Sequence, residues 1–231
     1  MATESPLLKL LGPSVLNEVG KKVSTEDALK GKELVLLYFS ASWCPPCKAF
    51  SPLLIQFYER CAKEGKFEII FVSSDKTVES FNEYYGKMPW LAIPTDGTAV
   101  KNELATTFQL SSIPTTLVLD CKTGNYITDD ARDTVAKIAS GTKEEGLALV
   151  KTWKEMEGVP IDEAAEKRKG EQPKQNPVMA LFLYIAKNPM YIFGMLYIYK
   201  YLKKTYFPSA GDPIMDDTDA ADVMGASEGE F

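Results

Sequence analysis

The chain has 231 residues, of which 45% are hydrophobic and 25% are charged, and its formal net charge is −6. This length favours one domain with an additional segment, or two small domains, and the charge excludes a strongly basic nucleic-acid-binding protein. The chain has four cysteines and no histidine. Because two of the cysteines form a C-x-x-C motif, they indicate catalytic use in a reducing compartment rather than a disulfide scaffold.

The N-terminal residues carry weak signals. Met1 to Asn17 contains a single basic residue, Lys9, and its apolar stretch is broken by Gly12-Pro13, so it lacks the pattern of a signal peptide. We expect Leu7 to Leu16 to form an edge strand and a turn, and Thr25 to Leu29 to form a short helix or turn.

A buried strand followed by a helix is predicted around the cysteine pair. Leu34 to Ser40 is a continuous apolar and aromatic run, which is typical of a fully buried strand. In Pro45 to Lys63 the apolar residues recur at helical spacing. Cys44 would then lie at the start of a helix, where unpaired N–H groups and the helix dipole lower a thiol's pKa. We therefore predict a redox-active pair, with Cys44 as the exposed nucleophile and Cys47 as the more buried resolving thiol.

A zinc site and a structural disulfide are both disfavoured for the C-x-x-C motif. A structural zinc site needs about four ligands, but the remaining cysteines, Cys61 and Cys121, are single and far apart. A structural disulfide between Cys44 and Cys47 would close a short loop, which removes little chain entropy and leaves the bond reducible. We expect no metal.

The rest of the first two thirds alternates strands and helices. The expected elements are a strand at Phe67–Ser73, helices at Val78–Tyr85 and Lys101–Phe108, a strand at Thr115–Asp120, a hairpin into Tyr126–Thr128 and a last helix at Lys143–Met156. This order predicts an α/β fold with a mixed central sheet flanked by helices.

Four stretches resemble one family. Tyr38 to Lys48 resembles the active-site stretch of the tryparedoxins, the thioredoxin-fold dithiol proteins of trypanosomatids, and the nucleoredoxins share most of it. Phe67–Ser73, Lys87–Ala92 and Ser112–Val118 are also similar to this family. The resemblance implies a thioredoxin-like fold and a thiol–disulfide oxidoreductase that has no bound cofactor. It further implies recharging by trypanothione or a similar dithiol, with electrons passed to peroxiredoxin-type protein disulfides.

Two alternatives stay open on the same residues. A nucleoredoxin-like protein-disulfide reductase would use another electron donor. A redox sensor or adaptor would bind its partners and turn over little.

The resemblance also implies a substrate-binding region. The Ile113-Pro114 bond would be cis and face the dithiol, leaving the backbone of Ile113 free to pair with an extended substrate. The other candidate substrate-binding residues are Trp43, Pro45, Pro46, Asp75 and Arg132. We expect Trp90, which lies in a similar loop, to be a core residue rather than a substrate contact.

Three positions depart from the resembled pattern. Ser74 stands where tryparedoxins usually carry tryptophan, and no Phe-Pro-Trp follows Arg132. Tyr38 stands where thioredoxins carry a buried acid, so proton transfer at Cys47 would fall to a water molecule or to the phenol.

The composition changes at Gly158, so we expect a catalytic domain at 1–157 and a charged, solvated linker at 158–177. Residues 178–202 are almost wholly apolar and long enough to span a bilayer, which takes about 20 residues. Lys187-Asn188-Pro189 interrupts them, so an interfacial segment or a packed hairpin is the alternative. Residues 203–231 would be an acidic, disordered tail. This layout predicts a tail-anchored protein with its catalytic domain facing the cytosol, on the mitochondrial outer membrane or the endoplasmic reticulum.

Overall fold

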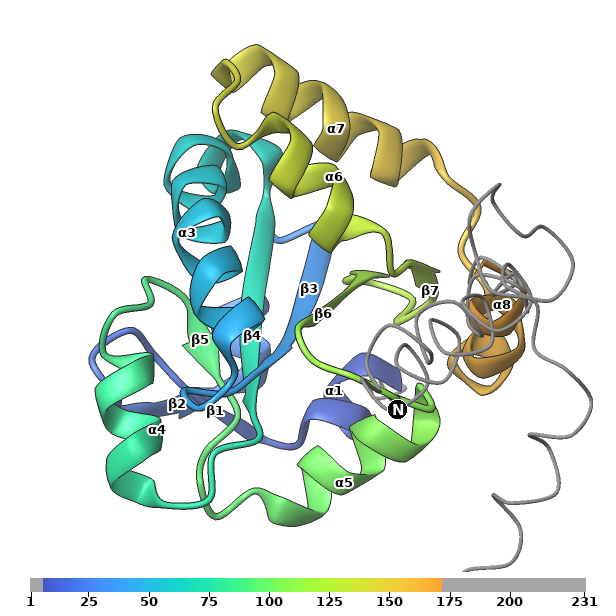
Figure 1. Cartoon of the computed structure of the whole chain (residues 1–231). Coiled ribbons are helices and arrows are strands. Elements are labelled where there is room, and N and C mark those ends of the chain that lie inside the picture. The colour runs from blue at the N-terminus through green and yellow to red at the C-terminus, as the bar shows by residue number, and fades with distance from the viewer. Residues whose placement is uncertain (1–5, 172–231) are drawn as a thin grey trace, which may run out of the picture. The chain divides into compact units, whose positions relative to one another are not determined.

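The computed structural model describes residues 6–171 (Figure 1). The strands are β1 (Ser14–Leu16), β2 (Lys22–Ser24), β3 (Leu34–Ser40), β4 (Phe67–Ser73), β5 (Leu91–Ala92), β6 (Thr115–Asp120) and β7 (Tyr126–Thr128). The helices are α1 (Pro6–Leu11), α2 (Thr25–Leu29), α3 (Pro45–Gly65), α4 (Val78–Tyr85), α5 (Thr98–Thr107), α6 (Ala131–Ile138), α7 (Lys143–Glu155), the 3₁₀ turn η1 (Ile161–Glu163) and α8 (Ala164–Glu171).

The strands form one mixed sheet in the order β2-β1-β5-β4-β3-β6-β7. Strand β3 lies at its centre, parallel to β4 and antiparallel to β6. Every residue of β3 and β4 is buried, as expected for strands that are covered on both faces. The predicted α/β fold with a mixed central sheet is therefore confirmed.

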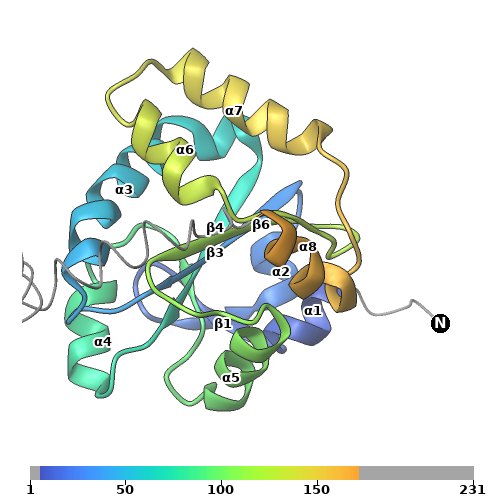
Figure 2. The same ribbon diagram turned by 45° about the vertical axis from the view of Figure 1, so that its right-hand side comes forward.

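Helices cover both faces of this sheet. Along β3, Leu34, Leu36 and Tyr38 belong to one apolar cluster, whereas Val35, Leu37 and Phe39 belong to another. This alternation follows from the period of a strand, which points successive side chains to opposite faces. Figure 2 shows α3, α6 and α7 on one side of the sheet and α1, α2, α5 and α8 on the other. The carboxyl end of β3 leads directly to the cysteine pair.

The N-terminal segment differs from the prediction. Residues Pro6–Leu11 form a helix rather than part of an edge strand, and only Ser14–Leu16 is extended. Leu7, Leu10 and Leu11 have the spacing of one helical face, and all three are buried in the second apolar cluster. Packing on the sheet therefore selects the helix.

The prediction of a charged, solvated linker at 158–177 is wrong for residues 158–171, which the structure describes. The main chain of Val159 exchanges two hydrogen bonds of 2.8 Å with Tyr126 on β7, which closes that edge of the sheet. Helix α8 follows, with Ala164 fully buried and Arg168 only 4% exposed. Residues 158–171 are therefore folded onto the domain, and Lys167 and Arg168 find partners there that the local sequence does not show.

The predicted anchor at 178–202 and the acidic tail at 203–231 lie outside the described residues. Within residues 6–171, no helix is both long enough and apolar enough to cross a membrane.

Candidate active site

The cysteine pair lies between the end of β3 and the start of α3, as predicted. Cys44 is the N-cap of α3 and forms a disulfide with Cys47, whose N–H donates to Cys44 Sγ at 3.3 Å. Cys47 is fully buried and Cys44 is 5% exposed. Cys44 is thus the more accessible of the two cysteines, but it is less exposed than the sequence suggested, because Ala41, Cys47 and Ile113 pack around it.

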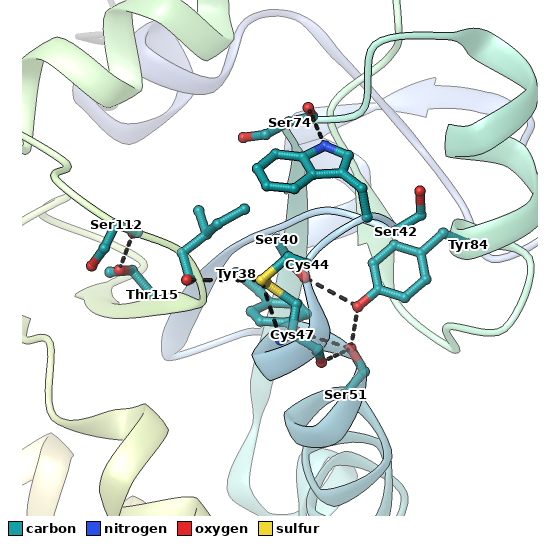
Figure 3. The surroundings of a disulfide bond; sticks show 12 residues. Tyr38, Ser40, Ser42, Cys44, Cys47, Ser51, Ser74, Tyr84, Ser112 and Thr115 are labelled. Carbon is teal, nitrogen blue, oxygen red and sulfur yellow. Dashed lines mark hydrogen bonds between the residues drawn. A yellow bond between two sulfur atoms is a disulfide. The ribbon is translucent and has the colours of Figure 1, made fainter. Parts of the chain in front are cut away.

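The Ile113-Pro114 peptide bond is cis, which confirms the prediction. The carbonyl oxygen of Ile113 lies 3.9 Å from Cys44 Sγ, so this loop faces the disulfide (Figure 3). Pro114 is buried and Ile113 is partly exposed. The Thr115 hydroxyl donates to the carbonyl of Ser112 at 2.8 Å and braces the loop from its other side.

Exposed apolar side chains flank Cys44 in the chain. Trp43 is 58% exposed, and its indole N–H donates to the Ser74 carbonyl at 3.2 Å. Pro45 and Pro46 are exposed in the first turn of α3, where a missing N–H costs nothing. Trp43, Pro45 and Pro46 therefore give the disulfide an exposed apolar surface beside Cys44.

Asp75 supports the loop that carries Cys44. Its carboxylate accepts the N–H of Ser42 at 2.8 Å and the hydroxyl of Ser73 at 2.8 Å. The N–H of Asp75 in turn donates to the Ser73 hydroxyl at 2.9 Å. These bonds tie the end of β4 to the turn before the disulfide, so this carboxylate holds the turn in place.

Arg132 pairs with a neighbouring residue on α6, and Trp90 packs in the apolar core. Arg132 is in the first turn of α6, 48% exposed, with its Nε 4.0 Å from the carboxylate of Asp133. This ion-pair contact stays within α6. Trp90 is 1% exposed and packs edge-to-face on Tyr38 and Tyr58, which confirms that it is a core residue.

A chain of buried hydroxyl groups below Cys47 was not predicted. The Ser51 hydroxyl lies 2.9 Å from the hydroxyl of Tyr38, 2.6 Å from that of Tyr84 and 3.0 Å from the Cys47 carbonyl oxygen (Figure 3). The Tyr84 hydroxyl also lies 3.1 Å from that of Ser40. The sequence contained one signal for these linked hydroxyl groups, because Ser51 lies on the buried face of α3. It gave no indication that Ser51 would pair with Tyr84 on α4.

The directions of these hydrogen bonds follow from the number of protons. Ser51 has a single hydroxyl proton, which it donates to the Cys47 carbonyl. Both phenols must then donate to Ser51, and Tyr84 is left to accept from Ser40. The chain therefore ends on the carbonyl oxygen of Cys47 and not on its sulfur.

The phenol of Tyr38 is not a base at neutral pH. Burial raises its pKa well above the usual value of a tyrosine. Within residues 6–171, the hydrogen bonds of Cys47 run to hydroxyl groups and to Cys44, and none runs to a carboxylate. The disulfide is therefore surrounded by apolar side chains and hydroxyl groups, and the carboxylate of Asp75 binds the turn before Cys44.

Metal coordination finds no support in the described part of the chain. Residues 6–171 contain no cluster of three or more Cys, Asp or Glu side chains that could hold a metal ion. Cys61 and Cys121 are free thiols in separate places.

Comparison with known proteins agrees with this geometry. A family model described as thioredoxin-like matches residues 31–126. Tryparedoxin from Trypanosoma brucei brucei is 46% identical over 138 residues, which cover 59% of this chain and 94% of that protein. Probable nucleoredoxin 1 from Arabidopsis thaliana is 48% identical over 122 residues, which cover 52% of this chain but only 20% of that longer protein.

Solved structures show the same similarity. Tryparedoxin from Trypanosoma brucei superposes with a TM-score of 0.54 at 41% identity, covering 58% of this chain and 94% of that one. Tryparedoxin II complexed with glutathionylspermidine gives a TM-score of 0.55 at 41% identity, covering 58% and 92%.

Proposed function

This chain belongs to the tryparedoxin- and nucleoredoxin-like family of thioredoxin-fold proteins, and on that premise we propose that it passes electrons from a trypanothione-type dithiol to protein disulfides. Its enzyme class is that of the family, a thiol–disulfide oxidoreductase that reduces protein disulfides. The observation that carries the proposal is the Cys44–Cys47 disulfide at the start of α3, beside the cis Ile113-Pro114 bond.

The reduced pair would act in two exchange steps. The Cys44 thiolate attacks one sulfur of a partner disulfide, so that a mixed disulfide forms and the first partner sulfur leaves as a thiolate, which takes a proton from water. Cys47 then loses its proton and attacks Cys44, which releases the second partner thiol. Two electrons and two protons reach the partner, and the Cys44–Cys47 disulfide forms.

The chain's own groups would favour this direction of attack. As the N-cap of α3, Cys44 lies at the positive end of the helix dipole, which stabilises a thiolate. Cys47 is fully buried and forms its disulfide with Cys44. With Tyr38 protonated and no carboxylate of residues 6–171 bonded to Cys47, the proton of Cys47 would leave through water or the departing partner thiolate.

The partner would bind along the cis-proline loop. The carbonyl of Ile113 faces the disulfide, so an extended segment could pair with this main chain as an added strand. Trp43, Pro45 and Pro46 would supply apolar contact on the other side of Cys44. Asp75 would contribute to partner binding indirectly, by holding the turn before Cys44 in place.

The donor and acceptors are part of the proposal. A trypanothione-type donor is supported by the solved complex of tryparedoxin II with glutathionylspermidine, a chain 41% identical to this one. Peroxiredoxin-type disulfides are proposed as acceptors because the resembled family serves them. A nucleoredoxin-like reductase with another donor is the second candidate, favoured by the 48% identity to nucleoredoxin 1.

A donor assay separates these candidates. The oxidised protein is mixed with trypanothione, or with thioredoxin reductase and NADPH, and the appearance of free thiols on Cys44 and Cys47 is followed. We expect reduction by trypanothione. Reduction by the reductase alone would establish the second candidate. Reduction by neither, together with no turnover on insulin with dithiothreitol, would contradict both.

We also propose that residues 178–202 attach the protein to a membrane, with the catalytic domain on the cytosolic side. The support is compositional: the segment is almost wholly apolar and is followed by basic residues.

A further inference from the structure

Helix α8 lies beyond the part of the chain that the thioredoxin-like family model matches, which ends at residue 126. Its Arg168 is 4% exposed. The Nε of Arg168 donates to the carboxylate of Asp129 at 3.0 Å, and its Nη1 donates to the carbonyl oxygen of Phe108. One guanidinium therefore joins two segments that are distant from it in sequence.

One of these segments leads directly to the cis-proline loop. Phe108 ends α5, where its carbonyl lies at the negative end of the helix dipole and favours a cation. Gln109 follows with a φ of 45°, and the chain then runs to Ile113, whose carbonyl faces Cys44. Gln109 is in the left-handed region without being glycine, so the surrounding contacts must hold this turn.

The other segment leads to α6. Asp129 precedes the N-cap Asp130, and Arg132 follows in the first turn. Asp130 forms a bridge with Thr116 on β6, just after the cis proline. Arg168 thus links the backbone carbonyl of Phe108, on the α5 side of the cis-proline loop, to the side-chain carboxylate of Asp129, on its α6 side.

Packing alone does not account for an arginine at this position. Val159 pairs with Tyr126, and Ala164 is fully buried in the apolar cluster, so α8 has other contacts that attach it. A buried charge costs several kcal/mol in desolvation unless it is well paired, and an apolar side chain of similar size often packs equally well. What arginine adds is a rigid fork of donors that reaches both partners at once.

We propose that Arg168 is a positioning residue for the substrate-binding loop 109–114, which it fixes through the carbonyl of Phe108. This inference rests on the proposed function, because it concerns how that site binds protein disulfides. When the arginine is removed, the loop samples other conformations. The apparent affinity for a protein disulfide then falls in proportion to the fraction of molecules whose loop remains in the binding conformation. Small disulfides, which do not pair with the loop, are affected little.

The test uses the full chain with Arg168→Met, Arg168→Lys and the matched control Lys167→Met. Lys167 is the neighbouring cation on α8 and donates to the carbonyls of Ile127 and Glu157, not to the loop. KM and kcat are measured for insulin and for bis(2-hydroxyethyl) disulfide, with dithiothreitol as the reductant. Hydrogen exchange is measured for amides 109–113.

For Arg168→Met we expect KM for insulin to rise about three- to tenfold, corresponding to a competent fraction of about a third to a tenth. Exchange in the loop should be faster, with kcat on the small disulfide unchanged within about twofold. Arg168→Lys should recover part of the affinity, because a lysine can keep one of the two contacts. Lys167→Met should leave both KM values and the loop exchange unchanged.

The proposal fails if folded Arg168→Met keeps the insulin KM and the loop exchange of the original protein. It also fails if Lys167→Met changes them equally, since α8 would then act only by packing. Failure of the proposed function looks different: the unaltered protein would reduce neither disulfide.

Discussion

Replacing Ser51 by alanine should destabilise the protein more than removing the hydroxyl group of Tyr38. The Ser51 hydroxyl is the shared partner of Tyr38, Tyr84 and the Cys47 carbonyl. Without it, Tyr38 keeps a 3.5 Å contact to the Cys47 carbonyl and Tyr84 keeps its bond with Ser40, among the residues that the structure describes. Two buried phenols therefore lose their best partner in one substitution.

The size of the effect follows from these lost partners. A buried polar group left without its hydrogen bond costs about 1–3 kcal/mol. Because each phenol keeps one weaker contact, we expect the low end for each and about 2 kcal/mol in total for Ser51→Ala. Tyr38→Phe is the matched control, since it removes one hydroxyl and leaves Ser51 bonded to both Tyr84 and Cys47; it should cost about 1 kcal/mol or less.

Urea unfolding of the oxidised proteins, followed by circular dichroism, measures the difference. With an m-value of about 2 kcal/mol/M, the midpoint should fall by about 1 M for Ser51→Ala and by about half of that or less for Tyr38→Phe, at unchanged m. Equal or reversed losses would refute the reasoning, because Ser51 would then not be the group on which the others depend.

Three further predictions concern the thiols and the C-terminal segment. Cys44→Ser should abolish insulin reduction, whereas Cys47→Ser should accumulate mixed disulfides, visible by mass spectrometry; full multiple turnover of Cys47→Ser would overturn the assigned roles. Burial raises the pKa of Cys121 to about 11, so its thiolate fraction, and its alkylation by iodoacetamide, should rise about tenfold per pH unit between pH 8 and pH 10; a rate that levels off below pH 10 would contradict this shift. The intact protein should resist alkaline carbonate extraction because of residues 178–202, while a chain ending at Glu171 should be soluble with unchanged dithiol activity; recovery of the intact protein in the soluble fraction without detergent would remove the anchor.

The sequence by itself determined the centre of this protein. A continuous apolar run identified Leu34–Ser40 as a buried strand, because a strand covered on both faces has no polar face to alternate with. A strand followed by a helical pattern placed Cys44 at the start of α3. The cis form of Ile113-Pro114 came from the family resemblance and not from the residues alone.

Only the tertiary structure decided what depends on distant partners. Pro6–Leu11 became helical because the sheet covers its apolar face, and Ser51 became the centre of a hydroxyl chain because α4 brings Tyr84 against it. Local charge predicted a solvated segment at α8, yet Arg168 is buried. The local sequence pattern of an element shows its periodicity, but it does not show which other elements will pack against it. A buried charge is stable only where the fold supplies polar partners, and for Arg168 these are a carboxylate and a carbonyl many residues away.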